Sequence, residues 1–103
     1  MKDIANLQKM LKTAKEMQEK LQQELAELRL EGSSGGGMVT VTLDGQKNLI
    51  LIRIDPEVVS KEDVEMLQDL IVAAFNDAAA KVDEHLAQKL GAFGGGLKIP
   101  GLF

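Results

Sequence analysis

The first apolar pattern of the chain is a heptad repeat between Ile4 and Leu28. Seven of the eight residues at its two seam positions are apolar, and the seam consists of Ile4, Leu11, Gln18 and Leu25 at one position and Leu7, Ala14, Leu21 and Leu28 at the other. An apolar stripe this narrow is typical of a helix that packs lengthwise on another helix. A helix that packs only on its own sheet is the alternative at this point.

After this helix the pattern changes to that of strands. The glycine- and serine-rich segment from Gly32 to Gly37 ends the helix and has room for a short strand and its turn. Met38 to Leu43 alternates, with Val39, Val41 and Leu43 on one face and Thr40 and Thr42 on the other. Asp44-Gly45 predicts a hairpin turn. The return strand, Asn48 to Ile54, is apolar on both faces, so a helix or a second subunit must cover its second face.

A second long helix is expected in the last third of the chain. Asp55-Pro56 predicts a short helical turn with Asp as its cap, and Ser60 to Asp63 approximates a capping box. The helix should run to about Leu90 and stop at Gly91. Its apolar residues are spaced three and four apart: Val64, Leu67, Leu70, Ile71, Ala74, Phe75, Ala78, Val82 and Leu86. The chain therefore divides into one α-β-β-β-α domain, residues 1–90, and a glycine-rich tail, residues 91–103.

Size and composition favour a shared core. A monomer of 103 residues buries only roughly 60 to 65 per cent of the surface of its unfolded chain, and only 3% of these residues are aromatic. We therefore predict a homodimer. The absence of cysteine excludes disulfides and thiolate chemistry and fits a reducing cytoplasm. A polar start and the lack of a ~20-residue apolar run predict a protein that is neither exported nor membrane-spanning.

The net charge of −4 argues against nucleic acid as a partner, but the charges are unevenly distributed. The first helix has a basic tip, with Lys2, Lys9, Lys12 and Lys15 against Asp3 alone, and an acidic second half. A second basic stripe is spaced four residues apart on the second helix and consists of Lys81, His85 and Lys89. These seven residues are the candidate DNA contacts, although lysine on a helix surface ordinarily serves solubility.

No catalytic site, metal site or cofactor site is predicted. His85, the only histidine, lies between two lysines on a helix face, without a recognisable nucleophile. Glu62, Glu65 and Asp69 lack a liganding loop and fit a hydrated surface better than a metal site. The glycine run lacks the lysine of a phosphate loop and fits a turn.

Five segments of the chain resemble the YbaB/EbfC family of bacterial nucleoid-associated DNA-binding proteins. They are QEKL at 18–21, GGGMVTVT at 35–42, IDP at 54–56, EMLQDLIVAAFNDA at 65–78 and PGLF at 100–103. The resemblance implies an α–β–β–β–α protomer, a homodimer joined through its sheets and helices, and helices that project as arms around duplex DNA. It implies neither a cofactor nor a reaction, and it implies a weak sequence preference. The acidic half of the first helix departs from what a strong DNA binder would carry.

We therefore predict an α+β fold, with a long N-terminal helix, a small antiparallel three-stranded sheet and a long C-terminal helix, in an intertwined homodimer. The predicted function is non-enzymatic binding of double-stranded DNA in the cytoplasmic nucleoid, with effects on nucleoid organisation and gene expression. No membrane and no small-molecule substrate is expected as a partner. The alternative is a dimeric adaptor that binds replication or recombination proteins through the acidic helix and the apolar tail.

Overall fold

The computed structural model describes residues 2–94. Its elements follow one another as α1 (Lys2–Glu27), β1 (Leu30–Ser34), the 3-10 turn η1 (Gly35–Gly37), β2 (Val39–Leu43), β3 (Leu49–Ile54), the 3-10 turn η2 (Pro56–Val58) and α2 (Val64–Gly94). The predicted α+β class is confirmed, with two long helices and a three-stranded antiparallel sheet in the order β1-β2-β3.

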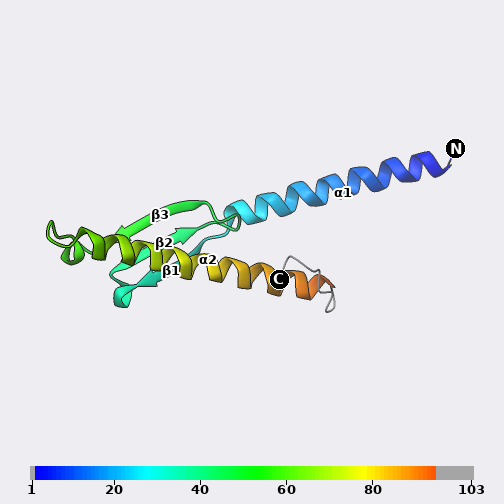
Figure 1. Cartoon of the computed structure of the whole chain (residues 1–103). Coiled ribbons are helices and arrows are strands. Elements are labelled where there is room, and N and C mark those ends of the chain that lie inside the picture. The colour runs from blue at the N-terminus through cyan, green and yellow to red at the C-terminus, as the bar shows by residue number, and fades with distance from the viewer. Residues whose placement is uncertain (1, 95–103) are drawn as a thin grey trace.

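Helix α1 projects away from the rest of the chain (Figure 1). The molecule measures 73 × 24 × 18 Å, and its radius of gyration is 19.7 Å. A compact domain of this length would have a radius of gyration of about 13 Å. The helix is therefore an arm, and the alternative in which it packs on its own sheet is wrong for this chain.

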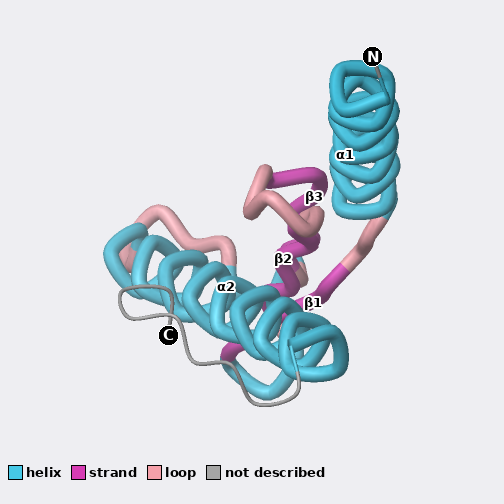
Figure 2. The backbone as a smooth tube through the Cα atoms, turned by 90° about the vertical axis from the view of Figure 1, so that its right-hand side faces the viewer, coloured by secondary structure: helices cyan, strands magenta, loops and turns pink. Residues whose placement is uncertain are grey.

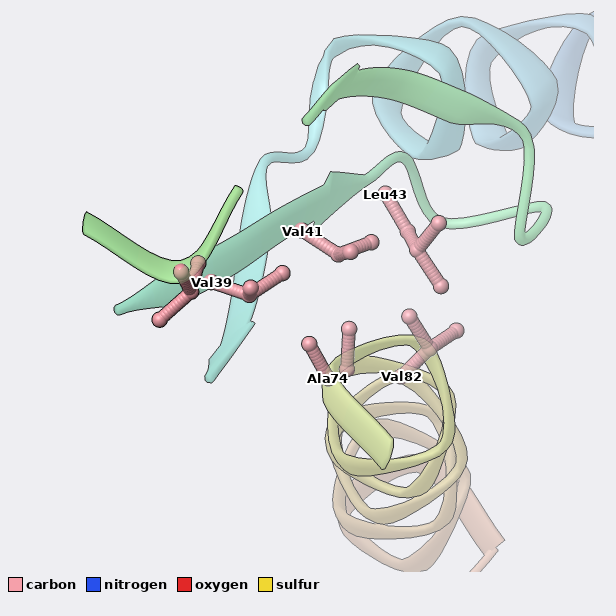
Figure 3. Packing of buried hydrophobic residues seen from close by; sticks show 7 residues of the cluster. Val39, Val41, Leu43, Ala74 and Val82 are labelled. Carbon is pink, nitrogen blue, oxygen red and sulfur yellow. The ribbon is translucent and has the colours of Figure 1, made fainter. Parts of the chain in front are cut away.

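The core lies between α2 and the sheet. Val39, Val41 and Leu43 are fully buried on the face of β2 that the alternation predicted. They pack on the α2 side chains of Ala74, Ala78 and Val82, as Figure 3 shows for the labelled residues. Of the predicted apolar residues of α2, only Val64 is largely exposed, at 51%. The spacing of three and four residues thus identified the buried face of α2.

Gly32 allows β1 to approach α2 closely. A Cβ atom at this position would collide with the backbone of Ala74 and Ala78. Beside it, the Ser34 hydroxyl donates to the carbonyl oxygen of Leu70 at 2.5 Å. The sequence suggested a helix-ending role for this glycine, and the structure adds that the strand can lie against the helix only without a side chain here.

The β2–β3 hairpin closes through a loop longer than the predicted two-residue turn. The Asp44 carboxylate accepts hydrogen bonds from the backbone of Gln46 at 2.8 Å and of Asn48 at 2.9 Å, and from the Asn48 amide at 3.0 Å. These bonds lower the pKa of the Asp44 carboxyl, and the bond from the Asn48 side chain has the largest effect. Gly45 N donates to Leu25 O at 2.8 Å, which ties the end of α1 to the hairpin.

Both predicted ends of α2 were wrong. The cap is Asp63, whose carboxylate accepts from Met66 N at 3.1 Å, whereas the Ser60 hydroxyl accepts from Glu62 N in the preceding turn. At the other end, α2 continues through Gly91 to Gly94. A helical glycine costs only about 1 kcal/mol, which is too little to end a long helix unless the glycine adopts positive φ. Residues 95–103 of the predicted tail lie outside the described part of the chain.

Helix α2 packs on β1 and β2, and β3 lies further from it (Figures 1 and 2). As the two-faced apolar pattern predicted, β3 carries apolar side chains that residues 2–94 do not cover. Leu49, Ile50 and Leu51 are 51%, 45% and 50% exposed.

Candidate nucleic-acid interface

The predicted basic tip lies at the far end of the α1 arm (Figure 1). Lys9, Lys12 and Lys15 are exposed there, and no ion pair within residues 2–94 engages them. Lys2 lies in the first turn of α1, and its side chain is outside the described part. Lys9 and Lys12 are three residues apart and hence on one side of the helix. The arm therefore presents solvated ammonium groups more than a helix turn from any other element of the fold.

The second predicted group occupies a different environment on α2. Lys81 Nζ donates to Glu31 O at 3.0 Å and lies 3.5 Å from Asp77 Oδ2. Lys89 Nζ lies 3.0 Å from Glu24 Oε2 on α1. His85 is half-buried between them. The structure thus brings Lys81, His85 and Lys89 onto one helix face, as their spacing predicted, but carboxylates already neutralise the two lysines.

Three other basic side chains also have partners within the chain. Lys47 pairs with Asp83 at 2.7 Å, and Arg53 lies 3.6 Å from Glu31. Arg29 donates to the carbonyl oxygens of Ala26 and Leu28, both at 2.8 Å, at the end of α1. These groups support the fold.

Asp77 links α2 to the sheet. Its carboxylate accepts from Ser33 N at 3.0 Å, and this bond, followed by the charge of Lys81, lowers the pKa of Asp77. Asp77 and Lys81 are four residues apart on α2, a spacing that brings their side chains together. Nothing in the sequence pointed to Ser33, or to the Glu24–Lys89 pair, because these contacts join residues far apart in the chain.

Within residues 2–94, no three histidine or acidic side chains are grouped as metal ligands would be. Two hollows of the described surface are open, and each follows one helix, along Asp63–Ala73 and along Lys9–Glu16. In the described part, no helix is both long enough and apolar enough to span a membrane.

An α+β body with a projecting, basic-tipped helix defines an interaction module, and comparison with known proteins assigns its family. Residues 1–97 match the YbaB/EbfC DNA-binding family. A nucleoid-associated protein of Caldanaerobacter subterraneus is 48% identical over 101 residues, which cover 95% of this chain and 91% of that protein. A nucleoid-associated protein of Bacillus licheniformis is 59% identical over 80 residues, which cover 78% of this chain and 75% of that protein.

The fold is also found in a solved structure. The crystal structure of an uncharacterized protein from Helicobacter pylori matches with a TM-score of 0.68 and 31% identity, over 84% of this chain and 89% of that one. The chain belongs to the YbaB/EbfC DNA-binding family. The resemblance seen in the sequence is confirmed, and the family consists of nucleoid-associated DNA-binding proteins rather than enzymes.

Proposed function

We propose that this chain binds duplex DNA as a homodimer, with little sequence preference, and acts in the bacterial nucleoid on DNA organisation and gene expression. The DNA contacts are phosphate contacts from Lys2, Lys9, Lys12 and Lys15 on the arm. Lys81, His85 and Lys89 form a second, weaker group because two of them are already paired.

The observation that carries the proposal is the solvated basic tip of a projecting helix. Lysine ammonium groups without carboxylate partners can replace the counterions of phosphates at low desolvation cost. The acidic second half of α1 repels the same phosphates, so affinity is low and depends on salt. The arm carries no arginine, and its tip has four lysines beside Asn6 and Gln8, so the contacts that it offers are mainly contacts with phosphates, which supports a weak sequence preference.

The exposed seam of α1 supports the homodimer. Ile4, Leu7 and Leu11 are 54%, 55% and 62% exposed, and Leu21 is 45% exposed. A helix with a solvated apolar stripe is stabilised when a second helix covers it. Two copies also bring two weak basic tips onto one duplex, which raises their joint affinity without any new contact.

A gel-shift titration against salt tests the proposal. Wild-type protein should bind a random-sequence duplex at low salt, and the logarithm of the affinity should fall linearly with the logarithm of the salt concentration. An unrelated duplex should compete nearly as well as the probe itself. Absence of binding at low salt would contradict the proposal and favour the adaptor. Tight binding to one short site at raised salt would contradict the weak sequence preference.

A further inference from the structure

The tip of α1 has a polar face on the side away from its apolar seam. Asn6, Lys9 and Thr13 are spaced three and four residues apart, so their side chains project from one side of the helix. All three are exposed. The seam runs along the other side, through Ile4 and Leu11. When a second helix covers the seam, the polar face is the side that stays open to a duplex.

An open hollow on this face carries the groups that hold a phosphate. Lys9, Lys12 and Thr13 are among the residues that line it, and Glu16 lies at the end nearer the body of the protein. Ammonium and hydroxyl groups are common donors to the phosphate oxygens of DNA. The Glu16 carboxylate repels a phosphate, so the phosphate is favoured at the Lys9 end of the hollow, next to Asn6.

Asn6 lies one turn beyond Lys9 towards the N-terminus, and its amide is available to a ligand. In the described part of the chain, the side-chain hydrogen bonds of α1 lie in its last two turns, at Gln23, Glu24 and Glu27. An asparagine amide carries a donor and an acceptor side by side. This pair matches N7 and the N6 amino group of adenine in the major groove, whereas a lysine has no acceptor and cannot match both.

The other amide side chains of α1 are placed differently. Gln8 points to nearly the opposite side of the helix from Asn6, about 160° around the axis, on the flank of the seam. Gln18 belongs to the seam itself. Gln22 and Gln23 lie in the acidic half of the helix, where carboxylates repel the DNA backbone. Asn6 is therefore the amide of the arm that lies beside the phosphate-holding hollow.

From this arrangement, we infer that Asn6 reads adenine in the major groove while the hollow at Lys9, Lys12 and Thr13 holds a neighbouring phosphate. An α-helix about 10–12 Å in diameter fits a major groove about 12 Å wide, and DNA-reading helices often contact bases through their N-terminal residues. The inference rests on the proposed function and names the base that the arm recognises. Since adenine recurs in every mixed-sequence duplex, one such contact leaves unrelated duplexes nearly equal as competitors.

Removing N7 of adenine tests the contact. Two duplexes of the same sequence carry either adenine or 7-deazaadenine, in which a C–H group replaces N7 while base pairing and charge are kept. The adenines are scattered, because A-tracts would narrow the minor groove. In fluorescence anisotropy at low salt, wild type should bind the 7-deazaadenine duplex about fivefold more weakly, the lower end of what one bidentate pair contributes.

Two matched variants locate the contact on the helix. Asn6→Ala should bind the two duplexes equally, whereas Gln8→Ala should keep the wild-type ratio of affinities. Both variants replace an exposed amide by the best helix former, so both keep the tip helical. Neither variant changes the net charge, so both should keep the wild-type dependence of affinity on salt.

The outcomes separate this inference from the proposed function. If wild type binds neither duplex at low salt, the proposed DNA binding fails. If wild type binds both duplexes equally, or if Asn6→Ala keeps the wild-type ratio, DNA binding stands and the assignment of Asn6 is overturned. Loss of the ratio in Gln8→Ala would also overturn the assignment, because the reading side of the helix would then not be that of Asn6.

Discussion

Glu24 near the end of α1 and Lys89 on α2 form an ion pair of 3.0 Å that joins the arm to the second helix, 65 residues further along the chain. The Lys89 side chain is 33% exposed and that of Glu24 is 44% exposed. The ion pair therefore engages Lys89, which its spacing on the helix alone had made a candidate DNA contact. Its contribution to stability is small, on the order of 0.5 kcal/mol.

Glu24→Gln should strengthen DNA binding. The change removes a negative charge and releases Lys89, so affinity should rise several-fold, and the salt slope should steepen by roughly 0.9 for one added phosphate contact. Fluorescence anisotropy with a labelled duplex measures both quantities. Glu27→Gln, which removes a carboxylate that has no basic partner within residues 2–94, is the control and should leave the slope unchanged. Equal slopes for the two variants would show that Lys89 gains no phosphate.

Gly32→Ala should strongly destabilise the protein, since the new Cβ meets the backbone of α2, which cannot move aside as a side chain can. The expected loss is about 3 kcal/mol or more in the free energy of unfolding measured with urea. Gly91→Ala is the control, because its Cβ would lie in open space. It should stabilise the helix by about 0.5 to 1 kcal/mol. Similar effects at both glycines would be incompatible with the close approach of β1 to α2.

Asp63→Ala should cost about 1 kcal/mol of unfolding free energy, because Met66 N loses its capping acceptor. Ser60→Ala should cost less, since its hydroxyl bonds to Glu62 in the turn before the helix. Thermal unfolding of the two variants measures the difference. A larger loss of unfolding free energy in Ser60→Ala would show that Ser60 is the helix cap, as the sequence pattern suggested.

Acid should weaken the hairpin. The folded state lowers the pKa of Asp44, foremost through the Asn48 side chain, so its carboxylate stabilises the fold above the unfolded pKa. This stability is lost as the pH falls below about 4 and through the folded pKa. Asp44→Asn should therefore lose more stability relative to wild type at pH 7 than at pH 3. Urea unfolding at the two pH values makes the comparison, and an equal difference at both would contradict it.

The parts of this protein that could be predicted from sequence are those with a local period. The heptads of α1, the alternation of Val39, Val41 and Leu43, and the buried stripe of α2 each follow one element. The structure confirms the helix over the heptads and the buried faces of β2 and α2, while the packing of the heptad seam on another helix stays a prediction. The cap at Asp63 and the continuation past Gly91 were missed, because several local signals competed within a few residues.

The candidate site was only partly predictable for a related physical reason. Spacing along one helix places Lys9 beside Lys12 and Lys81 beside Asp77. Spacing cannot show that Glu24 reaches Lys89 or that Ser33 reaches Asp77, because the packing of separate elements brings these residues together.

Reversing the charge of the arm tip tests the central claim most directly. Lys9→Glu/Lys12→Glu is compared with Lys20→Glu/Lys61→Glu, and both double variants change the net charge from −4 to −8, two units for each reversal. All four lysines are exposed, so each variant should keep the fold and the oligomeric state of wild type. Affinity for a random duplex is measured by anisotropy across a salt series. We predict that Lys9→Glu/Lys12→Glu abolishes binding, while the control binds more weakly than wild type with an unchanged salt slope. Wild-type affinity and slope in Lys9→Glu/Lys12→Glu would show that the tip of α1 is not the DNA surface.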